Sequence, residues 1–225
     1  MSFGFTDLGY FLWFLPVTAI LSLWLFKKRV HNQLAILLVM SYLFFFLASG
    51  WHLILLMIST IVDWTVGNKI HATNDNGKRK RWLILSLVTN LGILGIFKYL
   101  DFFIRSLGWW SLNVGIIPAE EVGLALPVGI SFYTFQTMSY TIDIYREKTK
   151  PSESLVTFAC YAAFFPQLVA GPIVRFSHFS EQVRKELFFS LPRLRLGVTL
   201  ILYGLVKKLI FADNFALQVD GIFSS

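Results

Sequence analysis

The chain has 225 residues, of which 56% are hydrophobic and 15% charged, and 20 Lys and Arg against 13 Asp and Glu give it a formal net charge of +7. This composition excludes an ordinary soluble domain of that length, which needs more polar surface. The basic residues form short clusters between apolar runs, as in loops on an anionic cytoplasmic leaflet, so we expect no nucleic-acid partner. The sequence therefore predicts a single membrane domain over residues 1–225, all-α and polytopic.

The basic clusters that flank the first two apolar runs indicate which of their ends are cytoplasmic. Leu8–Phe26 is long enough to span a bilayer, and the cluster Lys27–Arg29 after it indicates a cytoplasmic end and an outer N-terminus. Leu34–Val62 has basic segments on both sides, so an even number of crossings must lie within it. We expect two short helices that break near Ser49–Gly50, each too short to cross a full bilayer upright.

The next two spans return through the membrane. Trp82–Leu107 predicts one span, and Gly108–Leu126, which has acidic residues but no Lys or Arg, predicts an outer loop. Pro127–Tyr145 then leads back to the cytoplasmic side. A last helix is expected over about Leu196–Ala212. It carries the pair Lys207–Lys208, which must reach an interface or face protein.

Ser154–Val174 is apolar but has basic residues at both ends, which predicts a re-entrant hairpin and not a full crossing. Pro166, Gly171 and Pro172 break the run and are expected to shape its turn, since broken backbone at membrane depth is tolerated only beside protein or a wet cavity. Gln167 and Arg175 are candidates for the mouth of a substrate tunnel. Arg175 has a second interpretation, in which it only holds the hairpin at the headgroups.

The span that begins at Pro127 is unusually polar. Tyr133, Gln136 and Tyr140 fall on one helical face, where they could glue helices together or form the polar wall of a substrate tunnel. Near its cytoplasmic end, Asp143 is expected to pair with a nearby cation such as Arg146 and not to act as a base.

Neither the histidines nor the single cysteine indicates a metal or nucleophilic site. His31, His52, His71 and His178 show no metal-ligand spacing, so no metal is predicted. His52 is intramembrane and is expected to bond a neighbouring carbonyl group. Cys160 lies in an apolar run and is expected to be a small buried hydrophobe.

Several motifs in the right order resemble the membrane-bound O-acyltransferase (MBOAT) family, in particular its branch that O-acetylates alginate and D-alanylates teichoic acid. The stretches that carry the resemblance are Leu126–Gln136, Ser139–Tyr140, Ile142–Arg146, Phe164–Arg175, Gly204–Lys208 and Ala212–Asp213. The resemblance covers essentially the whole chain and is to the N-terminal half of the family.

The resemblance implies a ring of transmembrane and re-entrant helices around a tunnel, in the bacterial cytoplasmic (inner) membrane. It implies acyl transfer from a cytoplasmic donor, acetyl-CoA or another acyl thioester, to a hydroxyl of an exported polysaccharide such as alginate. No bound cofactor is expected. Membrane lipid, the polysaccharide acceptor and accessory acetylation or export proteins are the expected partners.

The family's catalytic histidine is expected downstream of Ser225, and none of the four histidines here matches it. We therefore expect a chain that is truncated, split or incompletely recorded, and inactive alone. Two other functions stay open: half of a transporter or flippase, since broken helices also build transport sites, and a scaffold subunit of a polysaccharide export complex.

Overall fold

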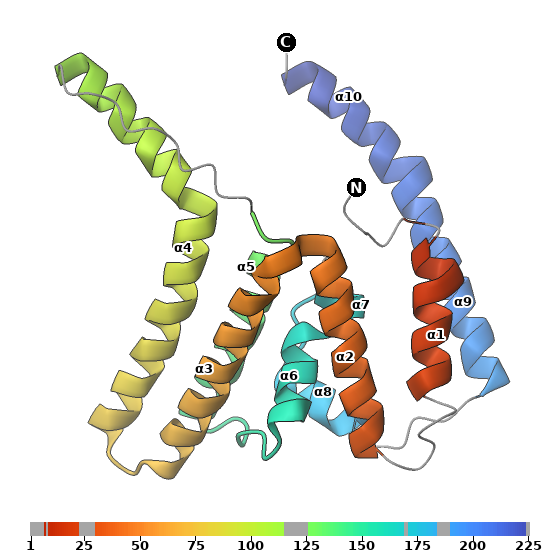
Figure 1. The fold of residues 1–225 in the computed structure, drawn as a ribbon, viewed down its shortest axis with the longest axis horizontal. Helices are drawn as coiled ribbons and strands as arrows, with labels where there is room; N and C mark the ends of the chain where they lie inside the picture. Colours follow the sequence, from red (N-terminus) through yellow and green to blue (C-terminus); the bar gives the residue numbers. More distant parts are fainter. Residues whose placement is uncertain are drawn as a thin grey trace.

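A computed structural model describes residues 7, 9–22, 30–114, 126–168, 171–183 and 190–223. Within these ranges every regular element is a helix, as the composition predicts (Figure 1). In chain order the elements are η1 (Tyr10–Phe14), α1 (Leu15–Ile20), α2 (Val30–Ser49), η3 (Gly50–His52), α3 (Leu53–Ala72), α4 (Asn76–Val114), α5 (Ile130–Tyr145), α6 (Leu155–Ala163), α7 (Phe165–Leu168), α8 (Phe176–Val183), α9 (Leu191–Val206), η4 (Lys207–Ala212) and α10 (Asp213–Phe223).

The second apolar run breaks at Ser49–Gly50, as predicted. Gly50 has φ +59°, a left-handed conformation that glycine adopts without strain, and it ends α2. The ring nitrogen Nδ1 of His52 donates to the carbonyl oxygen of Ser49 at 2.7 Å, as expected for this histidine. The two helices that meet here form a hairpin, with α2 and α3 as its arms (Figure 1).

The expected shortness of these two helices is wrong. Each has 20 residues, or about 30 Å of helix, which is a full bilayer core. Helix α3 continues through Lys69 and His71, because polar residues at a membrane interface do not end a helix. Helix α4 is also longer than expected. It includes residues 108–114 of the expected outer loop, while residues 115–125 of that loop lie outside the described residues. The first expected span is helical over η1 and α1, and the cluster Lys27–Arg29 lies outside the described part.

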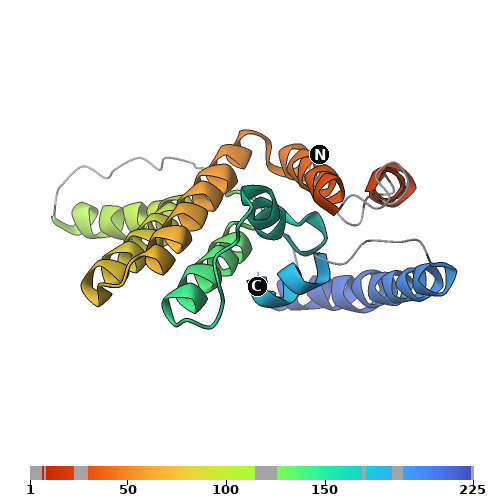
Figure 2. The same cartoon turned by 90° about the horizontal axis from the view of Figure 1, so that it is seen from below.

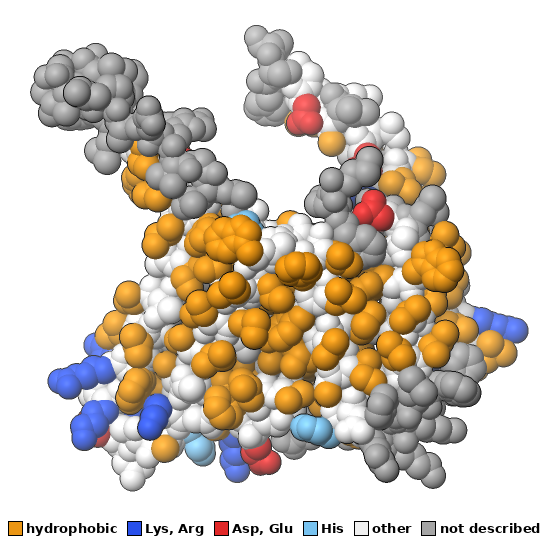
Figure 3. Space-filling view, in the orientation of Figure 1, with side chains coloured by type: hydrophobic (Ala, Val, Ile, Leu, Met, Phe, Trp, Pro, Cys, Tyr) orange, Lys and Arg blue, Asp and Glu red, His pale blue; other side chains and the backbone are white. Residues whose placement is uncertain are grey.

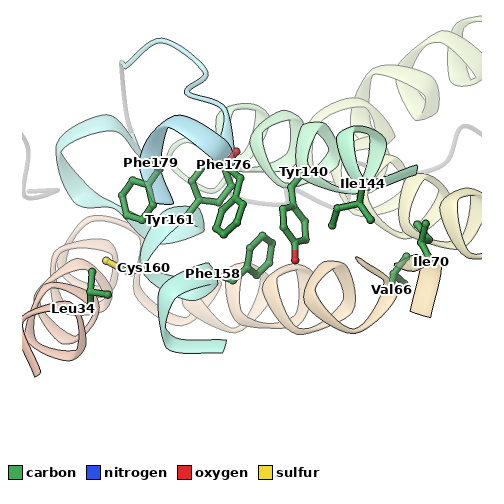
Figure 4. Packing of buried hydrophobic residues seen from close by; sticks show 10 residues of the cluster. All are labelled: Leu34, Val66, Ile70, Tyr140, Ile144, Phe158, Cys160, Tyr161, Phe176 and Phe179. Carbon is green, nitrogen blue, oxygen red and sulfur yellow. The ribbon is translucent and has the colours of Figure 1, made fainter. Parts of the chain in front are cut away.

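Helices α2 to α6 form a bundle. Helix α3 packs against α4, α5 and α6, and α2 packs against α6. One of three core clusters fills the space between α2, α3, α5, α6 and α8, with Tyr140, Phe158, Tyr161 and Phe176 stacked edge to face or tilted at its centre (Figure 4). Gly67 allows α3 to approach α5 closely, because a Cβ added to this residue would lie 2.8 Å from Cε1 of Tyr140.

Helices α9 and α10, joined by the π-helical turn η4, form one long rod at the side of the molecule (Figures 1 and 2). The rod extends beyond the expected range at both ends, and its described side chains are nearly all exposed. Near its middle, Lys208 pairs with Asp213, and Nζ of Lys207 lies 4.4 Å from the centre of the Tyr203 ring.

Among the described residues, two helical stretches are long and apolar enough to cross a membrane, Val30–Ala72 and Asn76–Ile104, and the first contains the α2–α3 hairpin. Hydrophobic side chains cover the middle of the face shown in Figure 3, and most of the Lys and Arg side chains lie along its lower edge. The loop between α3 and α4 lies at that edge (Figure 1). Positive charge gathered at one end is typical of the side of a membrane protein that faces the cytoplasm.

Candidate functional site

The site is built where α5 meets the reversal of the chain after α6. Helix α5 begins after Gly129, whose φ of +71° is left-handed. A Cβ at this position would lie 2.4 Å from the carbonyl oxygen of Leu168, so only glycine allows this contact with the turn after α7. The backbone N–H of Val128 donates to the hydroxyl of Ser49 at 2.8 Å, which fixes the start of α5 against the end of α2.

Tyr161 on α6 connects both limbs of the reversal with α5. Its carbonyl oxygen accepts from the side-chain amides of Gln136, at 2.6 Å, and of Gln167, at 3.3 Å. Its hydroxyl lies 3.1 Å from the carbonyl oxygen of Gln136 and 2.9 Å from that of Val174. One buried residue, through its backbone carbonyl oxygen and its hydroxyl, thus bonds the outgoing limb, the returning limb and the polar face of α5.

The returning limb is also held by an ion pair. Nη1 of Arg175 donates to both carboxylate oxygens of Asp143 at 2.8 Å. Asp143 thus pairs with a cation, as expected, but the partner is Arg175 and not Arg146. Arg146 caps the C-terminus of α5 and is exposed, whereas the carboxylate is buried on the side facing the returning limb. The geometry favours the interpretation in which Arg175 holds the hairpin.

The remaining tunnel candidates lie inside the bundle. The hydroxyl of Tyr140 accepts from the backbone N–H of Ser152 at 3.0 Å. Tyr133 is 1% exposed, and its hydroxyl is buried with no hydrogen-bond partner among the described residues. Gln136, Tyr140 and Gln167 thus bond to neighbouring segments, as helix-to-helix glue would. A role of these side chains in a tunnel stays a prediction.

The turn residues are placed as follows. Pro166 lies in α7, and Gly171 and Pro172 begin an extended segment after residues 169–170, which lie outside the described ranges. A Cβ at Gly171 would lie 2.7 Å from Cα of Gln167, so the close return of the chain requires glycine. Cys160 is fully buried, as expected of a small hydrophobe.

A buried polar cluster, which the sequence reasoning missed, joins α3, α4 and α5. Asp63 on α3 is fully buried and accepts from Ser86 at 2.5 Å and from the side-chain amide of Asn90 at 2.8 and 2.9 Å. The cluster comprises Ser59, Asp63, Ser86, Asn90, Thr137 and Thr141, and is hereafter the Asp63 cluster. It fixes the wall against which the reversal packs.

A signal for this cluster does exist in the sequence. Each of the three helices contributes two polar residues four positions apart, which lie one turn from each other on the same face. The pairs are Ser59 with Asp63, Ser86 with Asn90, and Thr137 with Thr141. Polar residues at this spacing inside apolar spans indicate contact between helices, since lipid cannot satisfy them.

Together these features define an all-helical membrane protein with a chain reversal bonded to a polar helix. The comparisons with known proteins show which family the chain is similar to. Residues 145–224 match the model of MBOAT, the membrane-bound O-acyltransferase family, which confirms the resemblance seen in the motifs.

Relatives match over nearly the whole chain. The probable alginate O-acetylase AlgI of Pseudomonas aeruginosa is 36% identical over 215 residues, which is 94% of this chain and 40% of the relative. The same protein of Pseudomonas syringae is 34% identical over equal shares. The peptidoglycan O-acetyltransferase of Helicobacter pylori is 32% identical over 239 residues, 92% of this chain and 44% of the relative. The chain thus spans about two fifths of the length of these relatives, and no solved structure matches it.

Proposed function

We propose that this chain forms part of a membrane O-acyltransferase that transfers an acetyl group to a hydroxyl of an exported polysaccharide. The observation that carries the proposal is the 36% identity with an alginate O-acetylase over 94% of the chain. The structure adds support, because the most specific motifs of the sequence, on α5 and on the reversal after α6, are bonded to each other through Tyr161 and the Asp143–Arg175 pair.

In the proposed reaction a general base takes the proton of the acceptor hydroxyl, whose oxygen attacks the carbonyl carbon of a cytoplasmic thioester such as acetyl-CoA. A new ester bond forms, the carbon–sulfur bond breaks, and the thiol leaves with a proton. Among the histidines, His52 is already bonded to a backbone carbonyl group, and His178 is exposed on α8. We expect the base on the part of the relatives that this chain does not span.

The role proposed for this chain is to build one wall of a helix ring in the bacterial inner membrane. Broken backbone at membrane depth needs surrounding protein, and the Tyr161 contacts supply it for the reversal. Gln167 and Arg175, which are partly exposed, are proposed to face the substrate passage once the ring is complete, while the buried Tyr133, Gln136 and Tyr140 support the wall from inside the bundle. Accessory acetylation or export proteins would deliver the polysaccharide to the outer side.

A chimera tests the proposal. In the P. aeruginosa alginate O-acetylase, the matched stretch is replaced by this chain, and the acetyl content of secreted alginate and the amount of chimera in the membrane are measured. We expect acetylated alginate. A chimera present at the relative's level that leaves alginate unacetylated would contradict the proposal. The amount of secreted polymer separates the alternatives, because loss of both polymer and acetyl groups would indicate a scaffold of the export complex.

A further inference from the structure

A cavity of about 700 Å³ opens at the basic end of the molecule, between the α3–α4 loop and the α5–α6 loop, and it is separate from the reversal described above. Its walls combine cationic side chains with hydrogen-bonding ones. The lining residues with polar side chains are His71, Thr73, Asn74, Arg79, Glu147, Lys148, Thr149 and Lys150, and the remaining one is Ile144.

The charge of this cavity is positive after internal pairing. Arg79 is paired with Glu147, with Nη1 2.6 Å from the carboxylate oxygen, so these two charges cancel. Glu147 is the only acidic residue in the lining. Lys148 and Lys150 remain, and neither has a carboxylate within ion-pair distance among the residues that the structure describes. An anion that enters the cavity therefore meets two unpaired cations.

Arg79 keeps one donor for a ligand. Its Nη1 donates to Glu147 and its Nη2 donates to the carbonyl oxygen of Tyr145 at 3.0 Å, which fixes the plane of the guanidinium group. Its Nε is buried and has no hydrogen-bond partner among the described residues. A buried donor without an acceptor destabilises the protein, and an anionic oxygen in the cavity would remove that cost.

The backbone at the rim of the cavity is strained at Glu147, the residue directly before Lys148. Glu147 has φ +58° and follows the C-cap of α5. The backbone N–H of Glu147 donates to the carbonyl oxygen of Ile144 at 3.0 Å and that of Lys148 to Asp143 at 2.9 Å, the two bonds of a Schellman motif. Glycine is usual at this position, and a non-glycine residue there is held by its surroundings, here by Arg79. Strain of this kind clusters at ligand sites.

The level of the cavity in the membrane suggests the ligand. The loops that join α3 to α4 and α5 to α6 lie at the lower end of the molecule in Figure 1, and most of the Lys and Arg side chains gather along that edge in Figure 3, below the apolar band. Lipid headgroups meet the cytoplasm at such a basic edge. Basic pockets at this depth bind phosphate-bearing headgroups. We propose that the cavity is a binding site for a phosphate group, carried by the headgroup of an anionic phospholipid.

The test uses the full chain in nanodiscs of phosphatidylcholine with increasing fractions of phosphatidylglycerol. Hydrogen–deuterium exchange is followed in peptides that cover residues 71–81 and 144–151. We expect protection of both loops that saturates with phosphatidylglycerol. The double variant Lys148→Gln/Lys150→Gln should need about 25-fold more lipid, roughly fivefold for each charge removed. Lys80→Gln is the matched control, since Lys80 is exposed on α4 and does not line the cavity.

A separate arm adds inorganic phosphate to nanodiscs of pure phosphatidylcholine. Protection by phosphate that the double variant loses would support the phosphate site and reassign its source to a soluble ligand. Arg79→Lys keeps the charge but loses the fixed fork, so it should also weaken protection in the arm that shows it. No protection in either arm, or equal weakening by Lys80→Gln, would overturn the proposal and leave only general attraction to a charged surface. Equal thermal unfolding midpoints of all variants in pure phosphatidylcholine verify the fold.

Discussion

The substitution Asn90→Leu tests whether the Asp63 cluster holds α3, α4 and α5 together. The side-chain amide of Asn90 donates to both carboxyl oxygens of Asp63, and its own oxygen accepts from Ser59 at 2.5 Å. After substitution the buried carboxyl loses both bonds from the amide and keeps the hydroxyl of Ser86. Hydrogen bonds inside membranes contribute about 0.6 kcal/mol on average and at most about 1.7. The three lost bonds therefore predict a loss of about 2–5 kcal/mol in the free energy of unfolding.

The double variant Asp63→Leu/Asn90→Leu tests whether the effects of the two residues on stability are coupled. Removing both partners leaves no buried polar atom without a bond, so we expect the double variant to be more stable than Asn90→Leu alone. The measurement is unfolding in mixed micelles with increasing SDS, followed by circular dichroism. Thr65→Val is the control on α3, because the Thr65 hydroxyl is exposed and bonds only its own helix, and it should change stability by less than about 0.5 kcal/mol. Additive losses in the double variant would refute the coupling.

Three further predictions concern the reversal. Arg175→Gln should lower the free energy of unfolding by about 1 kcal/mol, a modest value because the side chain is 56% exposed. Arg146→Gln should have almost no effect. Equal effects of the two substitutions in the same SDS assay would contradict the pairing of Asp143 with Arg175. Gly129→Ala should destabilise the protein by about 2–4 kcal/mol, because φ is +71° and the new Cβ would lie 2.4 Å from the carbonyl oxygen of Leu168. Gly197→Ala should not destabilise it, since a Cβ there meets nothing within 4 Å. A fully stable Gly129→Ala variant would refute the close approach. In the chimera, Gln167→Cys should react with water-soluble thiol reagents if the wall faces a passage, and reaction with lipid-soluble reagents alone would exclude that passage.

The sequence was sufficient to place the α2–α3 hairpin and its break. Basic clusters on both sides of Leu34–Val62 require an even number of crossings, and Gly50 is the one residue there suited to a left-handed break. Helix lengths were less predictable. Hydropathy marks where a helix leaves lipid and not where its hydrogen bonds end, so α3 and α4 continue past the apolar runs.

The partners of buried polar groups were predicted least well. Arg146 is near Asp143 in sequence, but the carboxylate bonds Arg175, 32 residues on, because the reversal brings the returning limb across α5. The sequence reasoning overlooked Asp63 at the end of an apolar run. The six polar residues of its cluster are spaced four positions apart in pairs on three helices, and this spacing indicates contact between helices. Which helices face each other follows from packing, and no local window of sequence contains it.

The long rod formed by α9, η4 and α10 makes its extensive contacts only within itself, whereas α2 to α8 are packed together. A ribosome delivers residues in order, and segments that complete their contacts early can settle before later ones emerge. The bundle can therefore mature during synthesis while the rod is still being inserted, so the rod finds its neighbours in the membrane after the bundle has formed.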